Sequence, residues 1–179
     1  MWIKHILIAL LFYFFALLQN SFFVHFGLFG GTPNLVFILF ILLVFFSSKN
    51  QGYLIVFYSL IGGLILDIFS YSHIGVSVTI MVVLGFLLKK VQLSLFEDPK
   101  KPMFFNFLVL FFVSFITYDL FFGFYSYLFK MSDFLVSFNL QLLGKVIYNL
   151  FFASMFFSVY KNFYADRFNN RQLSLFKNK

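Results

Sequence analysis

The sequence predicts an all-α integral membrane protein, a bundle of six transmembrane helices with both termini in the cytoplasm. Of its 179 residues, 62% are hydrophobic and 11% are charged, and the mean hydropathy is +0.96. A water-soluble domain of this size could not bury so much apolar surface. The apolar residues form six runs separated by polar breaks, and the basic residues gather in alternate breaks.

The expected transmembrane domain covers residues 1–160 and is followed by a polar cytoplasmic tail at 161–179. The first apolar run, residues 6–18, follows Lys4, and residues 19–23 offer no small-x-small cleavage site, so we expect a retained helix rather than a cleaved signal peptide. The second begins after a glycine-rich loop at Pro33, a residue suited to the first turn of a helix. The six spans are expected at about residues 3–26, 34–47, 53–70, 74–90, 103–129 and 134–160.

The later spans differ in length and in their flanking residues. The third and fourth are short against the roughly 20 residues that cross about 30 Å of hydrocarbon, which implies local thinning or extension into the loops. The most polar stretch, residues 89–102, precedes the fifth span. A turn at residues 130–133 joins the fifth and sixth spans into an antiparallel hairpin.

The distribution of Lys and Arg predicts the orientation, because these residues are enriched in cytoplasmic loops. With six spans, Lys130 falls in an opposite loop and Lys145 lies within the sixth span. The other basic residues fall on the side of the N-terminus: Lys4, Lys49, Lys89, Lys90, Lys100, Lys101, Lys161, Arg167, Arg171, Lys177 and Lys179. The net charge of +7 therefore reflects topology, and we expect the lipid bilayer, not nucleic acid, as the partner of these charges.

Asp67 stands near the end of the third span, in the stretch IGGLILDIFSYSHIG. We expect it at the outer rim, within reach of water, because Ser70 three residues later begins a polar break. Two interpretations stay open: a contact with a partner or ligand at the outer face, or a carboxylate favoured by the dipole of the next helix, with Ser72 as its N-cap. Gly62 and Gly63 in the same span predict close helix packing.

Asp119 and Lys145 are expected to form an ion pair inside the membrane. Each lies 13 residues from position 132, the middle of the turn between the last two spans, so an antiparallel hairpin places them at one depth. An unpaired charge at that depth would be costly. Gln141 and Asn149 share the stripe of Lys145 at i−4 and i+4 and could satisfy its remaining donors. A structural clasp and an ion or proton relay are both compatible with the pair.

The pentapeptide QLSLF occurs twice, at residues 92–96 and 172–176, in segments that the topology places in the cytoplasm. Leu and Phe beside lysines suit shallow insertion into an anionic leaflet, so we expect interfacial anchors. The pentapeptide also resembles the short peptide by which replication and repair proteins dock on the bacterial sliding clamp. The residues concerned are Gln92, Leu95, Phe96, Gln172, Leu175 and Phe176.

No catalytic or metal-binding pattern is visible. The chain has no cysteine, which removes disulfides and thiolate chemistry, and His5, His25 and His73 lack ligand spacing. G-x-S-x-G, H-E-x-x-H and P-loop patterns do not occur. We therefore expect no enzymatic activity, no metal and no cofactor.

Two short motifs resemble those of the rod shape-determining protein MreD family. The second span begins Pro33-Asn34-Leu35, where the family commonly has Pro-Asp-Leu, and the third contains Gly63-Leu64 followed by Asp67 and later Gly75. Asn34 departs from the usual Asp. The likeness covers roughly residues 1–160, and it marks Pro33, Asn34, Asp67, Ser70 and Gly75 as candidates for contact with a partner or ligand.

The resemblance implies a non-enzymatic component of the cell-wall elongation machinery in the bacterial cytoplasmic membrane. Its implied partners are MreC, the actin-like MreB filament, RodA and a class B penicillin-binding protein. The family is also similar in fold to the substrate-binding subunits of ECF vitamin transporters, which gives a second hypothesis, a solute-binding subunit with a pocket at the outer helix ends. The first span has Ala9 and Ala16 but not the closely spaced alanines of those subunits.

Overall fold

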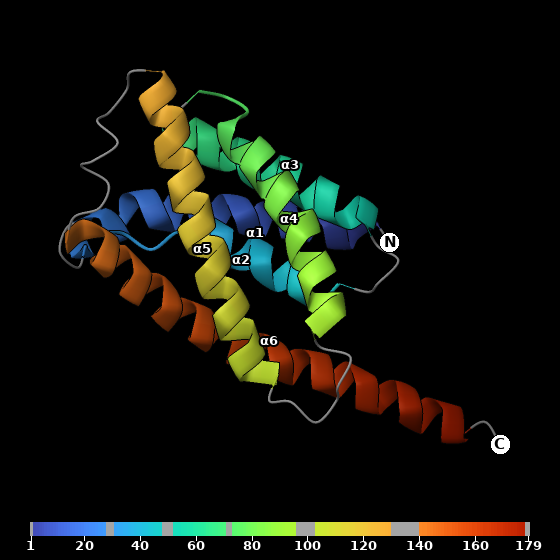
Figure 1. Ribbon diagram of the computed structural model, residues 1–179. Helices are drawn as coiled ribbons and strands as arrows, with labels where there is room; N and C mark the ends of the chain where they lie inside the picture. Colours follow the sequence, from blue (N-terminus) through green and yellow to red (C-terminus); the bar gives the residue numbers. More distant parts are fainter. Residues whose placement is uncertain are drawn as a thin grey trace.

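The computed structural model describes residues 2–27, 31–47, 52–70, 73–95, 103–129 and 140–177. The described residues form helices joined by short connections, without a β-strand, which confirms the all-α class (Figure 1). The elements are α1 (Trp2–Ser21), a 3₁₀ turn η1 (Phe23–Phe26), α2 (Leu35–Phe45), α3 (Gly52–Phe69), α4 (Val76–Leu95), α5 (Met103–Leu128) and α6 (Leu140–Lys177).

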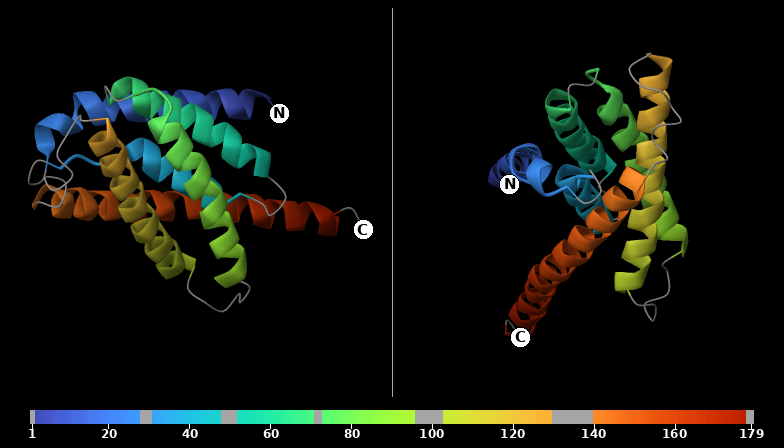
Figure 2. Two further views of the ribbon diagram at one scale, coloured as in Figure 1. Left: turned by 45° about the horizontal axis from the view of Figure 1, so that its top comes forward. Right: turned by 90° about the vertical axis from the view of Figure 1, so that its left-hand side faces the viewer.

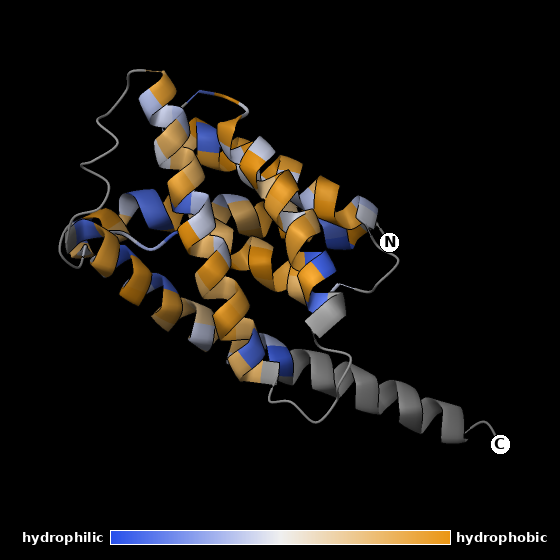
Figure 3. Cartoon of the chain, viewed as in Figure 1, coloured by the Kyte–Doolittle hydropathy of each residue, from blue (hydrophilic) through white to orange (hydrophobic). Residues whose placement is uncertain are grey.

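Four stretches of the described helices are long and apolar enough to cross a membrane: Ile3–Phe26, Gly52–Phe69, Phe104–Leu128 and Gln141–Lys161. Many large apolar side chains are exposed on the outside of the bundle, and apolar residues predominate along the described helices (Figure 3). In water this surface would be strongly unfavourable, whereas lipid tails solvate it. The chain is therefore a multi-pass membrane protein, while the count of six spans and the side of the termini stay predictions.

Helix α2 lies at the centre of the bundle and contacts each of the other five α-helices (Figures 1 and 2). All of its eleven residues are buried, because it carries apolar side chains around its whole circumference. Aromatic rings surround it: Phe37 meets Tyr118 with ring centroids 4.7 Å apart, and Phe45 meets Phe107 at 5.3 Å. At 1.5 Å per residue α2 is about 16 Å long, shorter than the expected span at residues 34–47.

Glycines allow the closest approaches in the bundle. A Cβ at Gly63 would lie 2.5 Å from the Val78 Cα, so α3 and α4 pack backbone to backbone there. A Cβ at Gly62 would meet the side-chain ends of Met81 and Phe12, both at 3.1 Å. The two glycines named for packing thus stand at helix contacts, and Gly63 has the tighter one.

Helix α6 does not stop at residue 160, where the sequence suggested a boundary between the last span and a polar tail. It continues without interruption to Lys177 and has 38 residues, about 57 Å at 1.5 Å per residue. Because that length is nearly twice the thickness of the hydrocarbon core, α6 must extend well beyond it on at least one side. Residues 134–139, at the expected start of this span, lie outside the described part of the chain.

Candidate functional site

The C-terminal end of α2 is held by two polar side chains of α4. The Lys89 ammonium donates to the Ser47 carbonyl oxygen at 2.6 Å, and the Gln92 amide donates to the Phe45 carbonyl oxygen at 2.8 Å. Lys89 also donates to the Gln92 side-chain oxygen at 3.1 Å. The last carbonyls of a helix have no partner within the helix, and a cation there is favoured by the helix dipole. These two residues therefore anchor the end of a buried helix.

This contact involves the first residue of the first QLSLF copy. Gln92 points to α2 and is half-buried. Leu95 ends α4 and Gln172, Leu175 and Phe176 lie in α6, where the description covers the backbone only. Phe96 is outside the described residues. Interfacial anchoring by either copy therefore stays a prediction.

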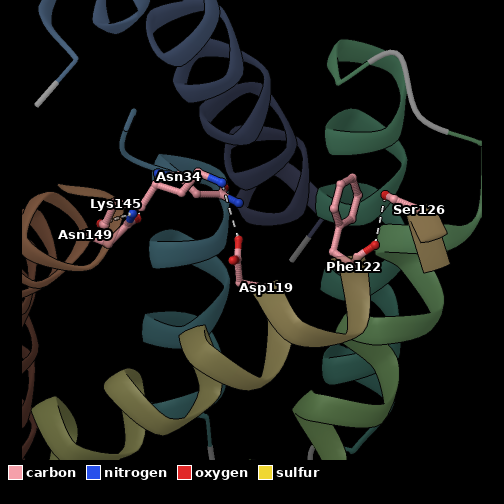
Figure 4. Close-up of polar contacts among 6 residues, drawn as sticks. All are labelled: Asn34, Asp119, Phe122, Ser126, Lys145 and Asn149. Carbon is pink, nitrogen blue, oxygen red and sulfur yellow. Dashed lines mark hydrogen bonds and ion pairs between the residues drawn. The ribbon is translucent and has the colours of Figure 1, made fainter. Parts of the chain in front are cut away.

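The N-terminal end of α2 is capped by Asn34. Its side-chain oxygen accepts the Phe37 N–H at 3.0 Å, the usual contact of an N-cap residue. Its own N–H donates to the Asn149 side-chain oxygen of α6 at 2.8 Å. The Asn149 amide donates in turn to the Lys145 carbonyl oxygen at 2.7 Å. Asn149 is fully buried, and it ties the cap of α2 to α6 (Figure 4).

Asp67 is buried, contrary to the expectation that it lies at a rim open to water. Its residue is 1% exposed, and its two carboxylate oxygens accept the N–H groups of Gly75 at 2.6 Å and Ser77 at 2.8 Å. These groups lie just before and within the first turn of α4, where helix N–H groups lack internal partners and a negative charge is favoured. Asp67 of α3 thus caps α4 across the connection, and Ser72, the expected cap, lies outside the described residues.

The cap of α4 is connected to α5. The Ser77 hydroxyl lies 3.0 Å from the Tyr118 hydroxyl. Both Ser77 and Tyr118 are buried, and the Tyr118 ring packs on Phe37 of α2. Polar contacts therefore link α3, α4 and α5 at one cap, and α2 and α6 at the other. In an apolar bundle such contacts are stable because each group has a partner.

Asp119 and Lys145 face each other beside this network (Figure 4). The Lys145 Nζ lies 3.6 Å from the Asp119 Oδ1, a distance of Coulombic attraction without a hydrogen bond. The Lys145 side chain is 35% exposed and that of Asp119 17%. Asn149, expected to satisfy the ammonium, instead binds the Lys145 backbone carbonyl. The Asp119 carboxylate and the Lys145 ammonium therefore have acceptor and donor sites that no described hydrogen bond uses.

Asp119 and Lys145 line a cavity of about 170 Å³ at the beginning of α2. It is partly open, and polar groups from α1, α3, α5 and α6 converge on it. The cavity brings together Pro33, Asn34, Ser70, Asp119 and Lys145 from the residues named in the sequence, but neither Asp67 nor Gly75. Its complete lining is Gln19, Thr32, Pro33, Asn34, Leu66, Ser70, Phe115, Tyr118, Asp119, Phe122, Lys145 and Asn149.

Gln19, Thr32 and Tyr118 were not singled out from the sequence. Tyr118 adjoins Asp119, but one aromatic ring among many carries no signal, and Gln19 was considered only as part of the stretch that lacks a cleavage site. Gly31 also matters, because a Cβ there would lie 2.6 Å from the Lys145 backbone nitrogen. Only a glycine lets the non-helical segment before α2 lie directly against α6.

The cavity is lined by polar groups of several kinds. Among the described residues no three His, Cys, Asp or Glu side chains converge on one point that could hold a metal ion. His5 packs on Phe57, and His73 stacks on Phe129 with ring centroids 4.7 Å apart, so neither lines the cavity. A carboxylate, an ammonium and several amides and hydroxyls could instead hold a small polar group.

A family model described as rod shape-determining protein MreD matches residues 2–166, nearly the whole chain. No curated protein and no solved structure matches the chain.

Proposed function

Because the chain belongs to the MreD family of rod shape-determining proteins, we propose that it scaffolds the cell-wall elongation machinery in the bacterial cytoplasmic membrane. The family is one of non-catalytic membrane proteins, and membership implies a role in determining rod shape. The family match over residues 2–166 is the observation that carries the proposal. The finer assignment, to a scaffold for MreC, MreB, RodA and a class B penicillin-binding protein, goes further than the match itself.

The proposed topology has six spans, with both termini in the cytoplasm. The distribution of Lys and Arg along the sequence supports it. Helix α2, about 16 Å long, would supply half of the second crossing, and the non-helical residues 31–34 would supply part of the rest. Non-helical backbone at membrane depth is tolerated where protein buries it or where it lines a cavity. Residues 31–34 lie against α6 and border the polar cavity, which fits this requirement.

Rigidity at the centre of the bundle suits a scaffold. Both ends of α2 are held by side chains of neighbouring helices, Lys89 and Gln92 at one end and Asn149 at the other. A membrane protein that positions several partners needs a fixed arrangement of its outer helical faces. The buried polar contacts supply that arrangement, because they fix both ends of α2 and α2 in turn positions the helices that pack against it.

Co-purification tests the scaffold directly. A tagged full-length chain, expressed from its native locus and cross-linked in cells before extraction, should retain MreC and the synthase pair RodA and class B penicillin-binding protein. A tagged, unrelated six-span protein of the same host serves as the control. Recovery of no elongation protein above this control would contradict the scaffold.

The cavity favours one second candidate, the substrate-binding subunit of an ECF-type transporter, because such a subunit needs a polar pocket at one end of its helices. The same co-purification separates the two functions. A transporter subunit should retain a transmembrane coupling protein and an ABC ATPase, and its loss should create a vitamin requirement without a change of shape.

A further inference from the structure

The two charged residues of the cavity are less well satisfied than the other buried polar groups of the bundle. Asp67 has an N–H group on each carboxylate oxygen, the Asn34 side-chain oxygen accepts the Phe37 N–H, and Asn149 uses both ends of its amide. Within the described part of the chain, the polar contact found for the side chains of Asp119 and Lys145 is their mutual one at 3.6 Å. An ammonium has three donors and a carboxylate about four acceptor sites.

A third residue that lines the cavity, Gln19, has a side-chain oxygen without a described hydrogen bond. The Gln19 side-chain oxygen is buried and has no hydrogen-bond partner among the described residues. Gln19 comes from the end of α1, whereas Asp119 and Lys145 come from α5 and α6. A buried polar atom without a partner costs free energy, and beside it the Asp119–Lys145 pair has unused donor and acceptor sites, so a polar occupant fits this cavity. The cavity of about 170 Å³ far exceeds the roughly 10–15 Å³ that one water needs.

From this arrangement we propose that the cavity is a binding site for a small zwitterionic group. Its anionic part binds the Lys145 ammonium, and its ammonium donates to the Asp119 carboxylate and the Gln19 oxygen. A ligand with a single charge would satisfy one member of the pair and repel or strand the other. A zwitterion satisfies both members and leaves the net charge of the site unchanged, which is the least costly arrangement in an apolar surrounding.

Two sources share this chemistry: a phosphoethanolamine lipid head group, and a free solute such as an amino acid. The site binds an ammonium through N–H donation, which predicts discrimination against the quaternary ammonium of phosphatidylcholine. That group carries the same charge but has no N–H. Phosphatidylglycerol, which has no ammonium, would leave Asp119 without a partner.

Binding measurements on the full-length protein test the proposal. Delipidated protein in detergent is titrated with phosphatidylethanolamine, phosphatidylcholine and phosphatidylglycerol of the same short chains, and with free glycerophosphoethanolamine and glycine. Native mass spectrometry counts the bound molecules. Saturable binding of the ethanolamine lipid alone identifies a lipid site. Binding of a free zwitterion at similar or higher affinity identifies a solute site.

Variants connect the binding to the cavity. Lys145→Gln and Asp119→Asn should each weaken binding about tenfold or more, the effect of losing one charge-assisted contact. Gln19→Met, which removes no described hydrogen bond and keeps the length of the side chain, should weaken binding without a loss of folding. Lys161→Gln, at an exposed position on the same helix as Lys145, is the matched control and should bind as the parent does. Equal binding of all three lipids, affinities unchanged in the three cavity variants, or no binding of any probe would overturn the proposal and leave a water-filled cavity.

Discussion

Replacing Asp67 by Asn removes a charge from the most completely buried carboxylate of the described structure, which is 1% exposed. The parent residue accepts two backbone N–H groups, at 2.6 and 2.8 Å, and hydrogen bonds to a charged acceptor contribute about 1.5–3 kcal/mol each. Asn keeps one acceptor oxygen, and a neutral side-chain hydrogen bond in a membrane protein contributes about 0.6 kcal/mol. With the lower value for each of the two charged bonds, and about 0.6 kcal/mol retained in the bond that Asn keeps, we expect the free energy of unfolding to fall by about 2–3 kcal/mol.

The assay is reversible unfolding of the purified protein in mixed micelles of a mild detergent and SDS, followed by tryptophan fluorescence or circular dichroism. A loss of 2–3 kcal/mol lowers the ratio of folded to unfolded protein by about 30- to 150-fold. Lys161→Gln is the control, since it removes a charge from an exposed position of α6 and should change the free energy of unfolding by less than about 0.5 kcal/mol. Asp67→Asn within about 0.5 kcal/mol of the parent, or no more harmful than Lys161→Gln, would refute the capping role.

Three further predictions rest on single contacts. Gly75→Ala should lower the free energy of unfolding by about 1–2 kcal/mol through backbone strain alone, because the φ of Gly75 is +105° and no atom lies within 4 Å of a new Cβ. Gly75→Asn should cost less, and equal costs of the two variants would argue against strain. Gly63→Ala should cost about 1–3 kcal/mol in the same unfolding assay, because its Cβ would strike the Val78 backbone. Gly62→Ala should cost clearly less, because its Cβ would meet only the flexible ends of side chains. The reverse order would show that α3 and α4 do not pack as described. Asp119→Lys and Lys145→Asp should each reduce the amount of protein in membranes, measured by quantitative immunoblot, and the double reversal should restore most of it; no recovery would speak against the pair.

Much of the fold follows from hydropathy and charge, because a lipid-exposed helix must be long and apolar. Four of the six expected spans coincide with stretches that could cross a membrane. The central position of α2 could not be predicted, since a helix that is apolar on all sides has the same hydropathy pattern whether lipid or protein surrounds it. Only the contacts with five other helices distinguish the two cases.

The site shows the same division between local and long-range information. The proximity of Asp119 and Lys145 followed from equal distances to one turn, because an antiparallel hairpin places such positions at one depth. The burial of Asp67 depends on how the chain returns after α3 to bring Gly75 and Ser77 over it, and no pattern in the sequence encodes that path. Gln92 caps a helix end 47 residues earlier in the chain, a contact that spacing within α4 cannot reveal.

Cell width during depletion tests the central claim, a role in rod-shape determination, most directly. Rod-shaped cells whose MreD-family protein is this chain are depleted of it, and width is followed by microscopy in medium with and without a full vitamin supplement. The account predicts wide or round cells in both media, with the width restored by re-expression. Cells of normal width that stop growing unless vitamins are supplied would contradict it and would assign the chain to solute uptake.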